Sequence, residues 1–336
     1  MVKKQLNNRV AYLLSQLQFF YKTITYDKLK NFLVVNYEYK HKKTKLKSMP
    51  YLAMIDPSNV CNLKCLICPN KVNKRKNSFM SFCTFKKIID KVGHHLFSVG
   101  LFNMGEPFMN KEIFRMIKYA ESKNIKTYLH SNMTLINKKN VDKLVNSGLR
   151  YITMSIDGAS QNTYTKYRMG GDFNKIINNV KLIIKKKMEN KTHFPFLEWK
   201  YMVFKYNEHE IARAEKMAKD IGVDFFRTVP FAAHTPVYKK INQKALLKVP
   251  PKSKIIYNKK TACYWLYKWL IINADGKVSC CCPSSKKKDD FGNINKENLK
   301  DIWNNRHFLS ARSLLKNGKS KKRYHQIVCN QCQEFL

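Results

Sequence analysis

Short apolar runs alternate with longer stretches of helical spacing through the middle of the chain. The runs are rich in β-branched and aromatic residues, as strands are, and the stretches between them repeat apolar residues every three or four positions, as amphipathic helices do. The expected strands span residues 51–55, 97–102, 126–130, 151–156, 197–204 and 224–229. The expected helices lie near residues 84–96, 111–122, 138–147, 173–188 and 208–220.

A strand followed by a helix, repeated about six times, predicts parallel β/α units joined by right-handed crossovers. Such units curl into a barrel, and a closed barrel needs eight of them. We therefore expect an α/β fold built on a partial (β/α)6 TIM-like barrel. An incomplete barrel leaves a wide lateral opening for a large substrate.

Composition divides the chain into four segments. Residues 1–48 are expected to form a basic, partly helical N-terminal extension, and residues 49–232 the barrel core. Residues 233–260 read as a proline-containing linker. Residues 261–336 are expected to form a small Cys-rich domain.

The N-terminal extension predicts a helix from the spacing of Val10, Leu13, Leu14, Leu17 and Phe20. We expect this helix to pack on the barrel. A membrane-surface helix is the alternative, because residues 39–47 are basic. The polar residues that break its apolar stretch, and the lack of a small-residue cleavage site, indicate mature protein and not a signal peptide.

Composition and charge indicate the cellular compartment and the kinds of partner that the protein could bind. The 336 residues are 44% hydrophobic, enough for a large core, and no run of about 18 apolar residues predicts a transmembrane helix. Ten cysteines without an export signal indicate a reducing compartment, the cytoplasm, where thiols bind metals or do chemistry. The net charge of +41 suits nucleic acid, but Lys far outnumbers Arg, which favours compositional drift.

The stretch SNVCNLKCLICPN places Cys61, Cys65 and Cys68 directly after the first expected strand. Functional residues of β/α barrels lie at the carboxyl ends of the strands. Thiolates suit iron–sulfur clusters and zinc. Three thiolates can hold three corners of a 4Fe–4S cluster and leave the fourth iron open, as a catalytic metal requires. Half of a zinc site completed elsewhere is the alternative.

This C-x-x-x-C-x-x-C loop resembles the signature of the radical S-adenosylmethionine (SAM) superfamily. Three further segments at expected strand ends are similar to other motifs of that family. Residues 104–107, MGEP, resemble its Gly-Gly-Glu-Pro motif, and residues 130–134, HSNMT, its Thr-Asn-Gly segment. Residues 155–158, SIDG, resemble the segment near the SAM ribose and carboxylate. The resemblance covers about residues 51–230.

The resemblance implies a 4Fe–4S cluster on the three cysteines and a SAM site made by Gly105, Glu106, Pro107, Asn132, Ser155, Asp157 and Arg168. Glu106 would meet the methionine ammonium, and Arg168 is a candidate partner for the SAM carboxylate. Met104 and Met133 stand where the family has glycine, and Ile67 where it often has an aromatic residue against adenine.

In that family the open iron chelates the amino and carboxylate groups of SAM. An electron, from a donor such as flavodoxin or ferredoxin, then cleaves SAM to methionine and a 5′-deoxyadenosyl radical. The radical abstracts a hydrogen atom from a substrate carbon.

The C-terminal domain carries six more cysteines, namely Cys263, Cys280, Cys281, Cys282, Cys329 and Cys332. Residues 272–280, INADGKVSC, predict a β-hairpin with an Asp-Gly turn, and residues 298–303 a short helix. A fully ligated site would use Cys263, Cys281, Cys329 and Cys332. The choice among the three consecutive cysteines stays open, although the spacing from Gly276 favours Cys281, and a zinc ribbon is the alternative site.

This tail resembles the SPASM and twitch modules of radical SAM enzymes, which hold auxiliary 4Fe–4S clusters. Seven cysteines mark the two-cluster form, so six favour the one-cluster twitch form. Cys83, alone at a predicted helix start, is expected to be a packed apolar residue.

An auxiliary cluster implies net two-electron oxidation of the substrate. The 48-residue extension is shorter than the leader-binding domain common in peptide-modifying relatives, and residues 191–210 resemble radical SAM oxidoreductases associated with surface polysaccharides. We therefore expect oxidation of a sugar-like or other small polar substrate. Peptide or protein modification and an RNA-directed reaction are the alternatives.

Overall fold

The computed structural model describes residues 24–72, 75–230, 263–281, 289–317 and 327–332. Its strands form a single sheet in the order β6-β5-β4-β3-β2-β1-β7-β8-β9. The strands are β1 Leu52–Ile55, β2 Ser98–Gly100, β3 Lys126–Ser131, β4 Tyr151–Ser155, β5 Phe196–Val203, β6 Phe225–Pro230, β7 Trp269–Ile272, β8 Lys277–Ser279 and β9 Asp290–Asn293.

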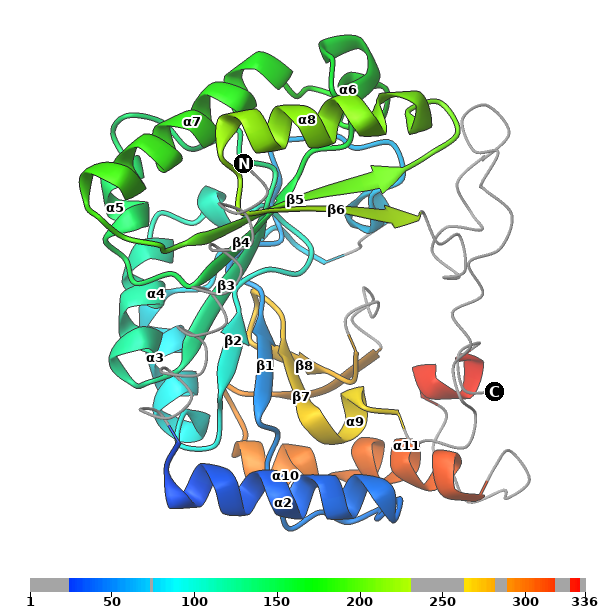
Figure 1. Cartoon of the computed structure of the whole chain (residues 1–336). Helices are drawn as coiled ribbons and strands as arrows, with labels where there is room; N and C mark the ends of the chain where they lie inside the picture. The colour runs from blue at the N-terminus through cyan, green and yellow to red at the C-terminus, as the bar shows by residue number, and fades with distance from the viewer. Residues whose placement is uncertain (1–23, 73–74, 231–262, 282–288, 318–326, 333–336) are drawn as a thin grey trace.

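The helices are α2 Tyr26–Lys40, α3 Phe82–Val92, α4 Ile113–Ser122, α5 Val141–Val145, α6 Gln161–Tyr167, α7 Phe173–Glu189, α8 Ile211–Ile221, α9 Trp265–Lys268, α10 Leu299–Trp303 and α11 Arg306–Asn317. The helices expected from the sequence correspond to α3, α4, α5, α7, α8 and α10, and the structure adds α2, α6, α9 and α11. Single 3-10 turns occur at η1 Pro69–Val72, η2 Pro107–Met109, η3 Glu208–Glu210 and η6 Val328–Gln331. Figure 1 shows helices α3, α4, α5, α7 and α8 on the outer face of the curved sheet.

Strands β1 to β6 are parallel, each to the next along the chain. This confirms the α/β fold and the partial TIM-like barrel that the alternation of strands and helices predicts. Amphipathic helices close its outer face; on α3 the buried residues are Phe85, Ile88, Ile89 and Val92, which are three, four and seven positions apart. The predicted helix over residues 10–20 lies outside the described residues.

The Cys-rich segment extends the sheet of the barrel. Strand β7 pairs in parallel with β1, and the hairpin β7–β8 adds β9 in antiparallel fashion. The Asp56 amide continues the β1–β7 ladder with a hydrogen bond of 2.8 Å to the Ile272 carbonyl. The predicted hairpin is confirmed, while the boundaries of the four segments remain a prediction.

Helix α2 and residues 41–48 pack against the helices of the C-terminal segment. The fully buried Arg312 on α11 donates to the carbonyls of Leu266 at 3.0 Å, Trp303 at 2.8 Å and Thr44 at 3.3 Å. Tyr267 donates through its hydroxyl to the Lys43 carbonyl at 3.0 Å. One buried side chain therefore joins the N-terminal extension to the C-terminal segment.

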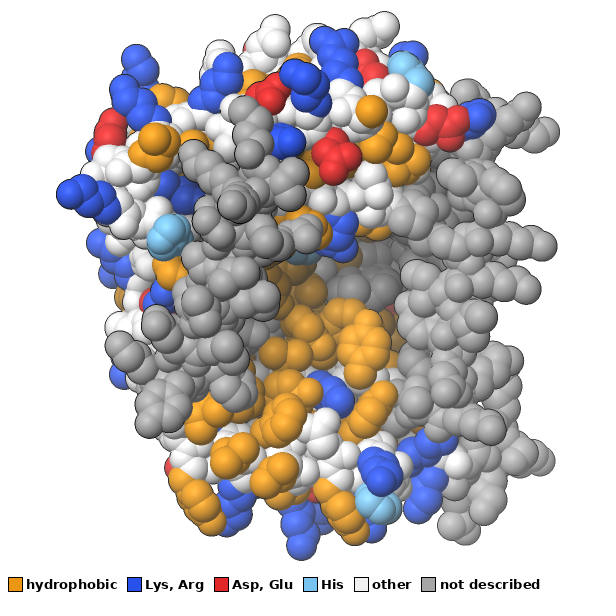
Figure 2. All heavy atoms as spheres, in the orientation of Figure 1, with side chains coloured by type: hydrophobic (Ala, Val, Ile, Leu, Met, Phe, Trp, Pro, Cys, Tyr) orange, Lys and Arg blue, Asp and Glu red, His pale blue; other side chains and the backbone are white. Residues whose placement is uncertain are grey.

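Two surface features concern the sequence predictions. Cys83 is exposed, so the prediction of a packed residue is wrong; it lies on the solvent side of α3, away from the buried face of that helix. Figure 2 shows hydrophobic side chains along the lower edge of the molecule, where α2 exposes Tyr26, Leu29, Leu33 and Tyr37. Within the described residues, no helix is long and apolar enough to cross a membrane.

Candidate active site and cysteine clusters

The loop after β1 carries the first cysteine cluster at the carboxyl edge of the sheet. Backbone hydrogen bonds fix this loop from two sides: Glu106 donates to the Val60 carbonyl at 2.9 Å, and Leu66 donates to the Tyr167 carbonyl at 2.9 Å. Within it, Cys65 is buried, whereas Cys61 and Cys68 are partly exposed. The thiols therefore lie on a loop whose backbone is hydrogen-bonded to the loops after β2 and α6.

Gly105 has a steric reason to be glycine. A Cβ atom there would lie 2.0 Å from the Ser58 carbonyl oxygen and 2.5 Å from that of Val60. Both carbonyls belong to the chain leading into the cysteine loop, so close approach of the two backbones requires glycine. Pro107 then begins the turn η2, whose N-cap is Glu106.

Glu106 joins the loop after β2 to the end of β3. Its buried carboxylate accepts hydrogen bonds from the Ser131 hydroxyl at 2.7 Å and the Asn132 amide at 2.8 Å. Burial raises the pKa of Glu106 to about 7, against the lowering effect of these donors and of Arg168. The group is therefore poised to change charge near neutrality.

Asn132 links the end of β3 to the cysteine loop. Its amide nitrogen Nδ2 lies 3.0 Å from Asn62 Oδ1 and 3.8 Å from Cys61 Sγ. The next residue, Met133, has a positive φ of 63°. This is the left-handed conformation that glycine adopts readily, so a glycine in the family's motif and a methionine here serve the same turn. Met133 instead adds a fully buried side chain to the core.

Asp157 and Arg168 form a buried ion pair beside the cysteine loop. Arg168 Nε donates to Asp157 Oδ2 at 2.6 Å, and Arg168 Nη1 lies 3.7 Å from Cys65 Sγ. The other carboxylate oxygen of Asp157 accepts the Met202 amide at 2.7 Å. Asp172, four residues after Arg168, instead caps α7 by accepting the Lys175 amide at 2.9 Å.

The donors around the loop fit an iron–sulfur cluster. N–H groups of Asn132 and Arg168 point at the thiols of Cys61 and Cys65, as they do toward the anionic sulfurs of such clusters. Burial raises the pKa of the Cys61 thiol to about 11, so a cation is needed to hold it as thiolate near neutral pH. Among the described residues, no three Cys, His, Asp or Glu side chains converge as they would around a single metal ion.

Ile67 and Ser155 complete the surroundings of this loop. Ile67 is buried in a small apolar cluster with Leu63, Tyr167 and Phe204. Ser155 ends β4, is buried, and lies opposite Lys200 of β5 in the sheet register. The residues that resemble the family's SAM-binding motifs thus come from loops or strand ends after β1, β2, β3 and β4, and they meet at one edge of the sheet.

The second cysteine cluster gathers around the end of β8. Cys280 Sγ lies 3.8 Å from Cys281 Sγ and 3.9 Å from Cys329 Sγ. Burial and the nearby thiols of Cys329 and Cys281 raise the pKa of Cys263. Cys332 is described and partly exposed, whereas Cys282 lies outside the described residues. Cys280 therefore makes the closest thiol contacts, although the sequence spacing favours Cys281.

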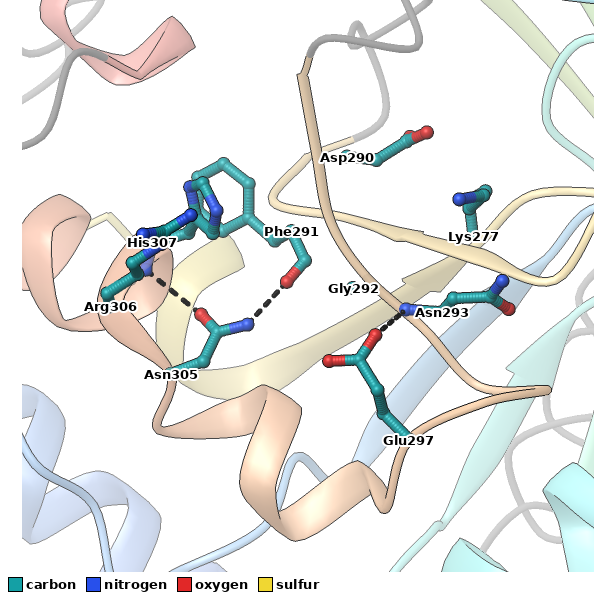
Figure 3. A pocket seen from close by; sticks show the side chains of 9 residues that line it. All are labelled: Lys277, Asp290, Phe291, Gly292, Asn293, Glu297, Asn305, Arg306 and His307. Atoms are coloured by element: carbon teal, nitrogen blue, oxygen red, sulfur yellow. Dashed lines mark hydrogen bonds between the residues drawn. The ribbon is translucent and has the colours of Figure 1, made fainter.

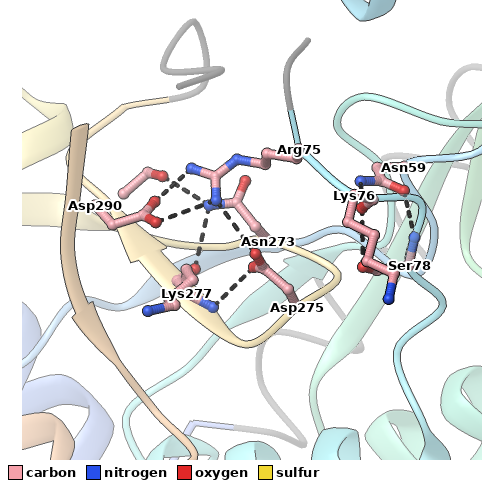
Figure 4. A network of polar contacts seen from close by, with 9 residues as sticks. Asn59, Arg75, Lys76, Ser78, Asn273, Asp275, Lys277 and Asp290 are labelled. Carbon is pink, nitrogen blue, oxygen red and sulfur yellow. Dashed lines mark hydrogen bonds and ion pairs between the residues drawn. The ribbon is translucent and has the colours of Figure 1, made fainter. Parts of the chain in front are cut away.

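A buried arginine ties the two cysteine regions together (Figure 4). Arg75, from the segment after the first cluster, forms an ion pair with Asp290 on β9 and donates to Asp275 Oδ2 at 3.4 Å in the β7–β8 turn. Only 2% of its side chain is exposed. Sequence patterns give no sign of this contact, because Arg75 and Asp290 lie 215 residues apart.

The concave face of the sheet carries a group of polar side chains on β4, β5 and β6, beside aromatic residues such as Tyr151 and Phe196. Leu197, Trp199 and Tyr201 of β5 belong to the hydrophobic core, so the alternate residues Glu198 and Lys200 lie on the other face. Glu198 is buried, accepts the Thr153 hydroxyl at 2.7 Å, and forms an ion pair with Arg227 of β6. His130 on the same face of β3 stacks on Phe102 with 3.7 Å between ring centroids. Sequence reasoning missed this group, although its alternation with core residues was visible.

A cavity of about 510 Å³ lies in the C-terminal segment, away from this chemistry (Figure 3). Its polar groups stabilise local turns: Asn305 donates to the Phe291 carbonyl at 2.5 Å, and Asn293 donates to Glu297 at 2.7 Å. No cysteine and no residue of the four strand-end motifs lines it. We assign it no catalytic role.

The curved sheet carries three cysteines after its first strand, SAM-type motifs at the ends of the following strands and a second cysteine cluster. This combination defines a class of iron–sulfur enzymes that use SAM. Family models agree. Residues 55–218 match the radical SAM superfamily, and residues 263–333 match the SPASM iron–sulfur cluster-binding domain. The chain belongs to the radical SAM superfamily. Its cofactors are a 4Fe–4S cluster that binds SAM, SAM itself, and auxiliary iron–sulfur in the C-terminal segment.

Relatives within this superfamily differ in what they act on. An AdoMet-dependent heme synthase of Methanosarcina barkeri is 27% identical over 48% of this chain and 45% of its own length. A cofactor-modifying protein for the tungsten-containing aldehyde ferredoxin oxidoreductase of Pyrococcus furiosus is 21% identical over 80% of this chain and 85% of its own. The chain thus spans less than half of the heme synthase.

Solved structures share the fold. Streptococcus suis SuiB bound to S-adenosylmethionine aligns with a TM-score of 0.65 and 17% identity, covering 88% of this chain and 73% of SuiB. SuiB bound to its precursor peptide SuiA aligns with a TM-score of 0.63 and 19% identity, over 79% of this chain and 67% of SuiB. At this identity the similarity establishes the fold, and the substrate is a separate question.

Proposed function

We propose that this protein is a radical SAM oxidoreductase that dehydrogenates an alcohol carbon of a sugar-like or other small polar substrate. The observation that carries the proposal is the polar group on the concave face, where Thr153, Glu198, Lys200 and Arg227 stand opposite the core side of the sheet. Such a group suits the hydroxyl and charged groups of a polar substrate.

A 4Fe–4S cluster held by Cys61, Cys65 and Cys68, with SAM bound to it, would supply a 5′-deoxyadenosyl radical able to remove one hydrogen atom from a carbon bearing a hydroxyl. For the carbon to become a carbonyl, one proton and one further electron would also have to leave it. An auxiliary iron–sulfur cluster in the C-terminal segment would accept that electron, and solvent or a basic side chain the proton. The net change is removal of two hydrogens from the substrate.

The chain's own residues position SAM. We assign the ammonium group to the loop of Gly105, Glu106 and Pro107, because Glu106 is a buried carboxylate beside the cysteine loop that makes no ion pair among the described residues. We assign the SAM carboxylate to Arg168, whose guanidinium lies between Asp157 and Cys65. Asn132 and Ser155 complete the site from β3 and β4.

For the auxiliary cluster we propose Cys263, Cys281, Cys329 and Cys332 as ligands of one 4Fe–4S cluster. A small iron–sulfur or flavin protein, such as a ferredoxin or flavodoxin, would reduce the SAM-binding cluster. Because these cofactors are sensitive to oxygen and need reduced thiols, we place the enzyme in the cytoplasm.

The test is anaerobic turnover of the reconstituted enzyme with free sugars, sugar phosphates and nucleotide sugars, followed by mass spectrometry. We expect 5′-deoxyadenosine together with a product two hydrogens lighter than one substrate. The variant with Cys61, Cys65 and Cys68 all changed to Ala should form neither. Deoxyadenosine without any oxidised sugar would contradict the proposal, and modification of a peptide or of RNA offered in parallel would replace it.

A further inference from the structure

The strands β5 and β6 place two cationic side chains next to each other on the concave face. Lys200 of β5 and Arg227 of β6 are direct partners in the parallel register. Side chains of register partners point to the same side of the sheet, so both cations share the face that carries Glu198 and Thr153. Lys200 is also opposite Ser155 of β4, which brings it to the edge of the proposed SAM site.

The carboxylates of this region are already paired. Asp157 binds Arg168, and Glu198 binds Arg227 and the Thr153 hydroxyl. Lys200 is the cation left over: among the described residues, none forms a hydrogen bond or ion pair with its ammonium group. Arg168, Arg227 and Lys200 thus lie near Asp157 and Glu198, and Lys200 is the cation of the three that contacts neither carboxylate directly.

The charges of this region act on one another. Burial lowers the pKa of Lys200, and the charges of Arg168 and Arg227 lower it further, against the raising effect of Asp157 and Glu198. Burial, with the charges of Lys200 and Arg227, lowers the pKa of His130 to about 3, so that this ring stays neutral and cannot compete for an anion. A largely buried ammonium group without an acceptor is costly, and an anion that enters the site would remove that cost.

Resting on the proposed function, we propose that Lys200 and Arg227 bind an anionic group of the substrate, a phosphate or a carboxylate, on the concave face of the barrel. Arg227 keeps its Nη groups clear of the Glu198 contact, which uses Nε, and 46% of its side chain is exposed. A buried ammonium and an exposed guanidinium fork together suit a group with several oxygens. The proposed substrate class is therefore an alcohol that also carries a phosphate or a carboxylate group.

The same chemistry has a second source, because SAM carries a carboxylate. The experiment therefore measures two ligands separately on the reconstituted holoenzyme: inorganic pyrophosphate, in the presence of SAM, and SAM alone. Titration calorimetry at about 0.2 M salt limits the non-specific attraction of a strongly basic protein. The variants are Lys200→Met, Lys200→Arg and Arg227→Gln, and the control is Lys126→Met, a partly buried lysine at the opposite end of β3.

We expect Lys200→Met to weaken pyrophosphate binding by about tenfold or more, Arg227→Gln to weaken it less, and Lys200→Arg to keep most of it. SAM affinity should stay within about threefold throughout. Iron content reports whether each variant folds. Unchanged pyrophosphate binding in Lys200→Met, or a loss of SAM affinity of equal size, would overturn the proposal. Because no turnover is required, this outcome is independent of whether a sugar is oxidised.

Discussion

Arg168 lies between the Asp157 carboxylate and the cysteine loop, with 2.6 Å from its Nε to Asp157 Oδ2 and 3.7 Å from its Nη1 to Cys65 Sγ. A lysine would keep the charge but could not reach both groups with one rigid fork. We expect Arg168→Lys to weaken SAM binding by about 10- to 100-fold, measured by equilibrium dialysis of the reconstituted enzyme. Arg115→Lys, at an exposed position, is the control. Equal SAM affinity in both variants would show that the fork is dispensable.

The pH dependence of SAM binding should report Glu106. Its pKa is raised to about 7 by burial, so the carboxylate that we propose for the SAM ammonium group is lost as the pH falls below that value. Affinity should therefore rise with pH, by up to about tenfold per unit, between about pH 5.5 and 7. Glu106→Gln should flatten this slope while keeping an oxygen for Asn132. A wild-type slope that persists in the variant would assign the titration to another group.

Gly105→Ala should disrupt the cysteine loop. The added Cβ would stand 2.0 Å from the Ser58 carbonyl, and backbone cannot move aside as a side-chain end can. We expect less than about half of the iron to be retained on reconstitution. Gly170→Ala is the matched control, because it carries a positive φ of 85° but open space around its Cβ. It should cost only about 1 kcal/mol of stability, with full iron content.

Removing the Arg75 side chain should loosen the C-terminal hairpin. Arg75→Met leaves Asp290 buried without its cation, a change that typically costs about 3–5 kcal/mol for a buried pair. We expect a lower thermal midpoint and a loss of auxiliary iron greater than that of the first cluster. The double variant Arg75→Met/Asp290→Leu removes both charges and should recover part of the midpoint. A midpoint unchanged by Arg75→Met would mean that the pair adds no net stability.

Single substitutions can show which of the consecutive cysteines is a cluster ligand. Cys280 is almost completely buried, whereas Cys281 is partly exposed, and the electrostatic influence of Cys281 reaches Cys263. We expect Cys281→Ala to remove about four irons per chain and Cys280→Ala to retain them, because the spacing from Gly276 favours Cys281 as the fourth thiolate of a 4Fe–4S cluster. The reverse result would make the close Cys280–Cys329 contact the site of ligation.

Much of the barrel is readable from the sequence, because a buried parallel strand and an amphipathic helix each leave a periodic pattern. All six strands of the barrel form where the alternation predicts them. Strand β9 was missed, since its residues DFGN carry no apolar alternation and become a strand only by pairing with β8. Helix α11 was also missed, although Phe308, Ala311 and Leu314 have helical spacing.

The candidate site is readable only where residues are close in sequence or resemble a family motif. The three cysteines of the first loop could be named in this way. The Arg75–Asp290 pair and the Thr153–Glu198–Arg227 group could not, because their partners come from distant strands and no local pattern marks them. Cys83 was predicted to be packed because cysteine is usually buried, but in the structure it lies on the surface.

The continuous sheet has a consequence for the timing of electron transfer. The cysteine loop leaves the end of β1, and Cys280 and Cys281 follow β8, which pairs with β7, the direct neighbour of β1. Electron tunnelling between two centres slows steeply as their separation grows. Here that separation is set by two rows of backbone hydrogen bonds, and no hinge lies between those rows. Under the proposed mechanism, the auxiliary cluster would therefore keep a fixed distance from the SAM-binding cluster in every turnover.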